Sequence, residues 1–524
     1  MSLLSTKPGK LSHKGKESTP TPYAPYFQTE HLLKDLHGRS FRGGVVTLGG
    51  QAVKFLLLTV STVTLARLLK PQDFGLTAMV GALIGFIGLW TDLGLSNATV
   101  QRSEITHAQV SALFWINCGL GAGVMLVVAL LAPAVAWFYH EPRLVGVTVA
   151  ISTVFLLGGS TVQHKALLRR QMRFKLIAII DSVSMAFGIA TGITMAWLQF
   201  GYWSLVGMQV GSTVLNCALV WATCGWRPGA LQRGVGARPM LAFGADVTGF
   251  QFLTYFTRNF DNILIGRVLG AAALGIYSKA YGLLALPMGQ INMPLSAVLL
   301  PALSRLQDKP SEYARLFLRA TRAIALITVP IVVFSFFLAQ DTVLVLLGRR
   351  WLAAARVFQL LAPAAAASAI AFVPNWLCQS LGRSRRQLHY ALVSAPICVT
   401  GFLIGIKWGV AGVAVSFSLT FTILFWAFVA YAASGSPVKC SEIALSFWSA
   451  FWPSCLAGFA AWMFRHAVLS DVRLGIAFGV CAIVFGIFYT GTIMCSRVSR
   501  PTVVAGFLAL SKSLYRPRVF SANQ

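Results

Sequence analysis

The chain has 524 residues, of which 56% are hydrophobic and only 11% are charged. Because soluble globular domains carry about 25% charged residues, this composition excludes an ordinary water-soluble protein and indicates that lipid surrounds most of the chain. The formal net charge is +28, from 43 Lys and Arg against 15 Asp and Glu. These basic residues lie mostly between apolar runs, so membrane topology explains them better than nucleic-acid binding, and we expect no nucleic-acid partner.

The apolar runs predict an all-α integral membrane protein with about 14 transmembrane helices, at roughly 20 residues per span. A polar segment at 1–42 predicts a disordered cytoplasmic tail, and no cleavable signal peptide is visible in it. The expected spans are 43–66, 75–98, 109–133, 144–162, 176–198, 203–223, 241–266, 272–300, 321–340, 355–378, 388–407, 410–433, 445–466 and 473–494. We expect an N-terminal six-helix lobe at 43–225, a C-terminal six-helix lobe at 241–433, two extra transmembrane helices at 445–494 and a basic cytoplasmic tail at 495–524.

The distribution of Lys and Arg predicts the orientation of these spans. With the N-terminus inside and the spans alternating, the inner segments hold about three times as many Lys and Arg as the outer links. The densest inner stretch runs from Lys165 to Lys175. We therefore expect both termini to lie in the cytoplasm.

A weak internal repeat relates the two lobes. Residues 51–75 align without gaps with residues 251–275, so that Arg67 falls on Arg267 and Gly75 on Gly275. The offset corresponds to six spans, an even number, so the halves are expected to be parallel repeats. Such halves recur in transporters, with the substrate site between them.

The sequence gives no sign of a metal site or of a nucleotide-binding motif. The nine cysteines form no CxxC pair and no Cys/His cluster, so we interpret them as small buried hydrophobic side chains. No GxxxxGK[ST] motif is present, so energy for transport would come from ion gradients, membrane potential or mass action. We expect no cofactor and no metal site.

An ordered set of short motifs resembles a known family. The motifs are Ala66–Leu69, Asp73–Gly75, Asp92–Ser96, Val100–Arg102, Leu168–Phe174, Asp261–Gly266, Leu274–Tyr277, Ser304–Asp308 and Gly348–Trp351. In this order they resemble the polysaccharide transport proteins of the multidrug/oligosaccharidyl-lipid/polysaccharide exporter superfamily, and most closely its Wzx-type repeat-unit flippases. The resemblance implies two six-helix lobes and export of a polyprenyl-pyrophosphate-linked oligosaccharide across a bacterial inner membrane, for exopolysaccharide or lipopolysaccharide synthesis. Membrane lipids and other polysaccharide assembly proteins are further candidate partners.

Basic residues inside spans are the candidate substrate-binding residues. Insertion of each costs on the order of 3 kcal/mol, so such residues are functional candidates by default. Lys54 lies in the first span, Arg258 in the seventh and Lys279 in the eighth. Arg binds phosphate oxygens in a bidentate way and Lys supplies a point charge, so we expect the three to line a pyrophosphate and glycan cavity between the lobes. Local pairing or snorkelling to the membrane surface is the alternative for each.

Two acidic residues of the seventh span are candidates for coupling or ion pairing. Asp261 follows Arg258 by three residues, so both lie on the same side of a helix. The pair either makes Arg258 tolerable in the membrane or forms a switch in which a proton on Asp261 frees Arg258. Asp246, near the cytoplasmic start of the same span, is the second candidate for coupling.

Two other functions stay open at this stage. A drug or organic-cation antiporter of the same superfamily would use Asp246 and Asp261, but the basic intramembrane residues favour an anionic substrate. A membrane polysaccharide polymerase or ligase would need catalytic groups in the outer links, where His140 and Glu141 are the best pair available. We therefore expect a transporter and not an enzyme.

Overall fold

The computed structural model describes residues 24–27, 36–88, 96, 99–100, 105–230 and 238–496. Apart from 3₁₀ turns at Arg349–Trp351 and Ile406–Trp408, every element in these ranges is an α-helix. The helices are α1 (Ala24–Phe27), α3 (Leu36–Leu68), α4 (Pro71–Gly88), α6 (His107–Tyr139), α7 (Leu144–Arg170), α8 (Phe174–Trp197), α9 (Trp203–Thr223), α10 (Arg238–Ser304), α11 (Pro310–Phe337), α12 (Ala339–Leu346), α13 (Leu352–Ser368), α14 (Phe372–Ser380), α15 (Ser384–Gly405), α16 (Gly409–Ala433), α17 (Cys440–Ala467) and α18 (Leu474–Cys495).

The expected all-α membrane fold is confirmed, and the described residues of the expected spans are mainly helical. The expected spans at 321–340 and 355–378 each cross from one helix into the next. Eleven stretches of the described helices are long and apolar enough to cross a membrane. The difference from the expected fourteen has two causes. The stretch 259–290 crosses a break in α10 and the stretch 384–433 holds both α15 and α16, so each counts once where two spans were expected. In addition, α4 is not among the eleven stretches. Part of the expected disordered tail is helical, since α1 and the start of α3 lie within 1–42. A helix needs no apolar residues to continue, so α3 extends beyond its span.

Helix ends follow local signals in the sequence. The α6 helix begins with a capping box, in which the Thr106 hydroxyl accepts from the amide of Gln109 and the Gln109 side chain accepts from the amide of Thr106. The long α10 is interrupted at Gly270, whose φ of +84° is a conformation that other residues rarely adopt. The break reverses the chain, so α10 supplies both the seventh and the eighth expected spans.

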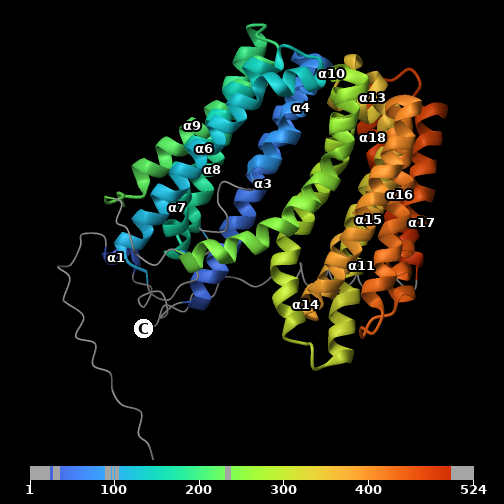
Figure 1. Ribbon diagram of the computed structural model, residues 1–524. Coiled ribbons are helices and arrows are strands. Elements are labelled where there is room, and N and C mark those ends of the chain that lie inside the picture. The colour runs from blue at the N-terminus through green and yellow to red at the C-terminus, as the bar shows by residue number, and fades with distance from the viewer. Residues whose placement is uncertain are drawn as a thin grey trace, which may run out of the picture.

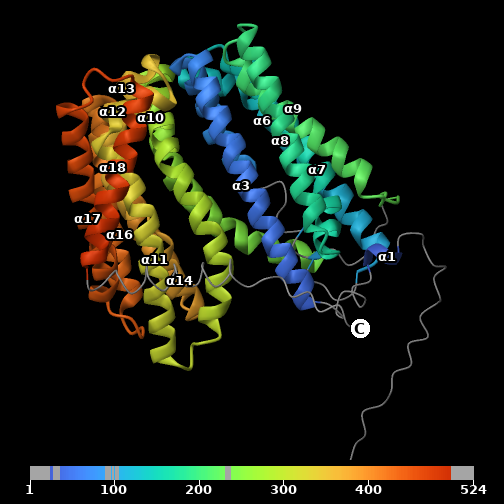
Figure 2. The ribbon, with the colours of Figure 1, turned by 180° about the vertical axis from the view of Figure 1, so that it is seen from behind.

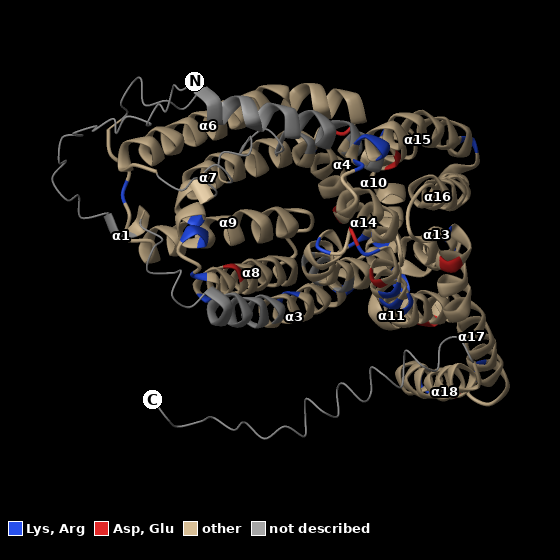
Figure 3. Cartoon of the chain, turned by 90° about the horizontal axis from the view of Figure 1, so that it is seen from below, with Lys and Arg blue, Asp and Glu red and all other residues tan. Residues whose placement is uncertain are grey.

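The helices form two halves. In the N-terminal half α6 packs on α7, α8 on α9 and on α3, and α7 on α9. In the C-terminal half α11 packs on α17, α13 and α15 each on α16, and α10 on α13. Seen from below, α18 lies at the outer edge beside α17 (Figure 3).

The halves meet through α4 and α10. The ribbons of the two halves converge at the top of the view and diverge towards the bottom, where α1 and α14 lie (Figures 1 and 2). One buried cluster is continuous across this junction and includes Phe74 and Met79 from the N-terminal half with Tyr277 and Trp351 from the C-terminal half. Large apolar side chains also face outwards, such as Leu130, which is 71% exposed. Helices that are apolar on all sides are typical of a membrane protein.

Candidate functional site

A cluster of polar side chains joins four helices of the N-terminal half. Lys54 of α3 donates to Asp181 Oδ2 of α8 at 2.9 Å, and Lys165 of α7 donates to Asp181 Oδ1 at 3.4 Å. Asn216 of α9 donates to the same Oδ1 at 3.3 Å. The charged side chains of this Asp181 cluster are each 26–27% exposed. Lys54, which was expected to line the substrate cavity, therefore lies in an ion cluster within one half.

The Asp181 cluster has an excess of positive charge. Two ammonium groups share one carboxylate, and a single negative charge cannot neutralise both. Pairing lowers the cost of holding these groups at membrane depth, and the remaining positive charge attracts anions. Sequence reasoning did not identify the partners of Lys54, because they lie on separate helices and only the packing of α3, α7, α8 and α9 brings them together.

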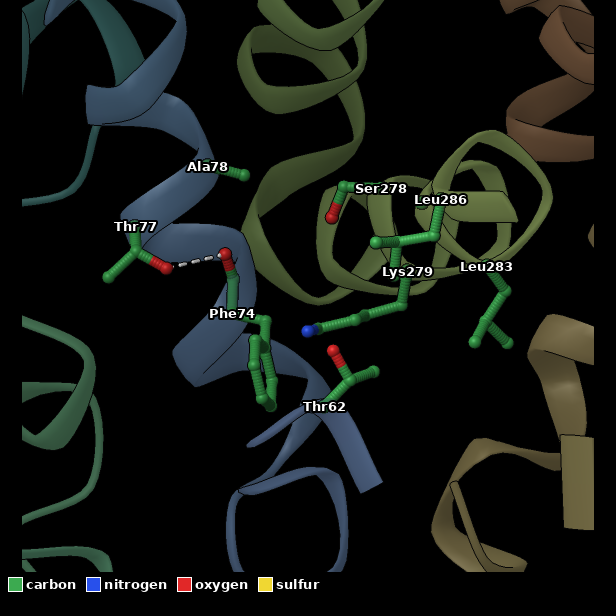
Figure 4. A pocket seen from close by; sticks show the side chains of 9 residues that line it. Thr62, Phe74, Thr77, Ala78, Ser278, Lys279, Leu283 and Leu286 are labelled. Atoms are coloured by element: carbon green, nitrogen blue, oxygen red, sulfur yellow. Dashed lines mark hydrogen bonds between the residues drawn. The ribbon is translucent and has the colours of Figure 1, made fainter. Parts of the chain in front are cut away.

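Lys279 of α10 lines a cavity between the halves. The cavity has a volume of about 280 Å³. Its lining residues are Thr62, Phe74, Thr77, Ala78, Ser278, Lys279, Gly282, Leu283 and Leu286. The Lys279 ammonium points at the ring of Phe74 of α4 and lies 3.9 Å from its centroid (Figure 4). Among the nine lining residues Lys279 alone is charged, so it gives this cavity a positive character.

The hydroxyl groups of the cavity are partly engaged with the backbone. Thr77 Oγ1 donates to the Phe74 carbonyl at 2.9 Å, and Ser278 Oγ donates to the Gly275 carbonyl at 3.2 Å. A hydroxyl that donates to the backbone presents only lone pairs to a ligand. Among the residues that line this cavity, Lys279 is therefore the charged donor to an anion, and the hydroxyl of Thr62 is a neutral one.

Asp261 is buried within α10 on the other side of the Gly270 break. The Tyr277 hydroxyl donates to Asp261 Oδ2 at 2.7 Å, and the Asn262 amide donates to Oδ1 at 2.8 Å. Asp261 is only 4% exposed, so these donors compensate part of its lost hydration. The bond to Tyr277 joins the two arms of α10. The side chains of Arg258 and Asp246 lie outside the described residues, and the expected pair of Arg258 with Asp261 stays a prediction.

Two pairs of residues related by the sequence repeat bring α4 and α10 into backbone contact. A Cβ atom on Gly75 would overlap the carbonyl oxygen of Ala271, and one on Gly275 would overlap that of Pro71. We call these four residues the glycine crossing. Both pairs obey the repeat offset, since Pro71 corresponds to Ala271 and Gly75 to Gly275. The halves thus meet there about a local pseudo-twofold axis.

Side chains from both halves surround the glycine crossing. Arg67 donates to the Val345 carbonyl at 2.7 Å, and the Trp351 indole donates to the Ala66 carbonyl at 2.7 Å. Arg267, the repeat counterpart of Arg67, bonds to the ring of His140. Each arginine thus reaches from the end of its helix to the opposite half. The sequence repeat identified both arginines but not their partners.

A family comparison agrees with this arrangement. The family described as "Polysaccharide biosynthesis protein" matches residues 64–356, which is more than half of the chain. The chain belongs to this family. The matched region includes the glycine crossing, Lys279, Asp261 and the members of the Asp181 cluster other than Lys54.

Curated relatives have matching names. The chain is 26% identical over 308 residues to the lipopolysaccharide biosynthesis protein WzxC of Escherichia coli, which covers 58% of this chain and 62% of that protein. It is 28% identical over 282 residues to the teichuronic acid biosynthesis protein TuaB of Bacillus subtilis, an alignment that covers 53% of this chain and 58% of TuaB. It is 26% identical over 312 residues to the succinoglycan biosynthesis transport protein ExoT of Rhizobium meliloti, covering 59% and 62%. The alignments thus span about three fifths of each of these relatives.

Solved structures show the same fold. The lipid II flippase MurJ in an inward closed conformation has a TM-score of 0.67 at 12% identity, covering 86% of this chain and 98% of that one. An inward-facing multidrug resistance MATE family transporter has a TM-score of 0.58 at 12% identity, covering 76% and 99%. The structural comparison therefore shows that the present chain shares the fold of these two proteins.

Proposed function

We propose that the chain is a flippase that moves a polyprenyl-pyrophosphate-linked oligosaccharide from the inner to the outer leaflet of a bacterial inner membrane. The products served by such a unit would be exopolysaccharide or lipopolysaccharide. The observation that carries the proposal is Lys279, a lone charged side chain in a cavity between two repeat-related halves. A diphosphate is the anionic part of the substrate, and its charge matches this site.

The family and its relatives support the substrate class. The matched family is described as a polysaccharide biosynthesis protein family, and ExoT is named as a transport protein of succinoglycan biosynthesis. A lipid-linked glycan also suits the architecture, since its polyprenyl chain could stay in lipid while the polar head group passes between the halves. The Asp181 cluster, with its excess positive charge, provides a second attraction for an anion within the N-terminal half.

The proposed mechanism is alternating access. With the N-terminus inside, the halves diverge at the cytoplasmic end and meet at the outer end, where the glycine crossing lies. The head group would enter from the cytoplasm, contact Lys279 and leave after the halves part at the glycine crossing. An inside-negative potential favours outward movement of negative charge by about 2.3 kcal/mol per charge per 100 mV. Asp261 and Asp246 are the candidate residues for coupling this movement to a cation.

The direct test is translocation in proteoliposomes. A fluorescent polyprenyl-pyrophosphate oligosaccharide is placed in one leaflet, and its appearance in the other is followed for wild type, Lys279→Met and Lys407→Met. Lys407 is an exposed lysine between α15 and α16 and serves as the matched control. We expect Lys279→Met to lower the rate at least tenfold and Lys407→Met to leave it unchanged.

The possible results separate the competing functions. If Lys279→Met transports as fast as wild type, the cationic cavity is not the substrate site, although the transport class stands. If folded wild type moves no lipid-linked glycan, the proposal fails. Uptake of a hydrophobic cation that Asp261→Asn abolishes would then support the organic-cation antiporter.

A further inference from the structure

Lys279 and Phe74 form a cation–π contact between the halves, and no carboxylate takes part in it. The ammonium belongs to α10 and the ring to α4, with 3.9 Å between the nitrogen and the ring centroid. Within the described part of the chain no acidic side chain forms an ion pair with Lys279. The negative face of an aromatic ring attracts a cation, more strongly where water is excluded. The ring of Phe74 is therefore the group that holds the Lys279 charge.

The same ring belongs to the junction of the halves. Phe74 precedes Gly75 of the glycine crossing, and its ring packs against Trp351 with 5.3 Å between centroids in an edge-to-face arrangement. Trp351 in turn donates to the Ala66 carbonyl on α3. One aromatic side chain thus contacts the charged group of the cavity and the residues that join the halves.

We propose that an anion in the cavity draws the Lys279 ammonium away from Phe74 and thereby weakens the glycine crossing. The inference rests on the proposed function, because it takes the diphosphate of the substrate as the anion. A full negative charge attracts an ammonium more strongly than a ring quadrupole at similar distance. Once the ammonium turns to the anion, α4 and α10 lose one of the attractions between them. Substrate binding and opening at the glycine crossing become linked.

Linkage requires the effect to be reciprocal. If the anion must break the contact of Lys279 with Phe74 in order to bind, the cost of breaking it lowers the affinity of the cavity for the anion. Weakening this contact should therefore tighten anion binding. It should also favour the parted state of the halves before any anion binds. A ring that only filled space would produce neither effect, so the two readouts together identify the role of Phe74 as a positioning residue.

The test replaces Phe74 by phenylalanines with increasing ring fluorination, which weaken the cation–π attraction with little change in size. Spin labels at Leu198→Cys and Trp408→Cys report the distance between the halves by pulsed electron resonance. These positions are 59% and 69% exposed and lie in the α8–α9 and α15–α16 links at the end where the glycine crossing lies. Cys495, which is exposed, is changed to Ser in all variants. The probe is farnesyl pyrophosphate, and farnesol is the uncharged control.

In wild type we expect farnesyl pyrophosphate to lengthen the label distance and farnesol to leave it unchanged. Fluorination should tighten farnesyl pyrophosphate binding by up to about tenfold and lengthen the distance before the probe is added. Lys279→Met should weaken binding, and fluorination should then have no further effect on either quantity. Phe74→Tyr retains the ring face and should resemble wild type.

Three negative results can be told apart. If wild type binds farnesyl pyrophosphate and opens, but fluorination changes neither affinity nor distance, the proposed link through Phe74 is wrong and the flippase proposal stands. If wild type does not bind farnesyl pyrophosphate and the labels do not respond, the link and the anionic substrate site both fail. Equal fluorination effects in the presence and absence of the Lys279 side chain would assign Phe74 to packing against Trp351 alone and overturn the proposal.

Discussion

Asp181 is shared by two ammonium groups, and this makes its carboxylate more important to stability than either lysine. Removal of Lys54 or Lys165 leaves a simple ion pair with Asp181, whereas removal of Asp181 leaves two like charges without compensation. A partly buried charge that loses its partner is strongly unfavourable. The cluster therefore behaves as a unit in which the three side chains are not equivalent.

The first prediction follows from this arrangement. Asp181→Asn should destabilise the protein by about 1–3 kcal/mol, less than a fully buried pair because the groups are about a quarter exposed. Adding Lys165→Met to Asp181→Asn should restore part of the loss, since it removes an uncompensated charge. The check is the apparent melting temperature in detergent. A double variant less stable than Asp181→Asn would contradict this account.

Single residues also show what the sequence can and cannot reveal. The cost of a charge at membrane depth identified Lys54 and Lys279 from the sequence alone. Their partners could not be predicted, because Asp181 and Phe74 lie on other helices and a cation–π contact has no signature in spacing. Arg67 and Arg267 were recognised through the repeat, but their bonds to the opposite half depend on how the halves pack.

Among the elements, α17 is fastened to the C-terminal half by an ion pair that sequence reasoning missed. Arg465 Nε lies 3.0 Å from Asp341 Oδ2 of α12, and their side chains are only 16% and 13% exposed. The Arg465 guanidinium also donates to the Leu469 carbonyl at 2.6 Å, beyond the end of α17. This pair therefore positions the turn between α17 and α18.

The second prediction concerns this pair. Arg465→Met should cost about 3 kcal/mol, because it leaves the Asp341 charge buried without a partner. The double variant Asp341→Leu/Arg465→Met should cost less than either single change. The exposed pair of Lys309 with Glu312 provides the control, and its loss should cost at most about 1 kcal/mol. Additive losses in the thermal unfolding of the double variant would show that the pair does not act as a unit.

The third prediction concerns the glycine crossing. Gly75→Ala and Gly275→Ala should each force α4 and α10 apart, since the new Cβ would overlap a backbone carbonyl of the other helix. We expect a longer distance between labels at Leu198→Cys and Trp408→Cys. Gly81→Ala and Gly289→Ala on the same helices are matched controls, because a Cβ there meets nothing within 4 Å. If Gly75→Ala and Gly275→Ala leave the distance between the two labels unchanged, the glycine crossing is not a close contact of the halves.

At the scale of the whole molecule, the repeat gives the protein two related halves, with the glycine crossing on their local axis. The number and order of the helices could be predicted from the apolar runs, because membrane thickness fixes the length of a span. The positions where the halves touch could not, because identical spacing is compatible with many ways of packing two bundles. The glycine crossing is nevertheless consistent with the repeat, since Gly75 and Gly275 are equivalent in both.

The last prediction concerns orientation, on which the direction of transport depends. We expect the end of the molecule where α1 and α14 lie to be cytoplasmic, because the segments that carry most Lys and Arg in the sequence remain inside. A membrane-impermeant maleimide added to intact cells should therefore label Leu198→Cys and Trp408→Cys at the opposite end. Ala230→Cys in the link after α9 and Ser311→Cys in the first turn of α11 are exposed positions that should react only after permeabilisation. The Cys495→Ser background without an added cysteine measures labelling of native thiols. The reverse pattern would place the glycine crossing at the cytoplasmic side, so that the halves would diverge outwards and substrate capture from the inner leaflet would require the parted state first.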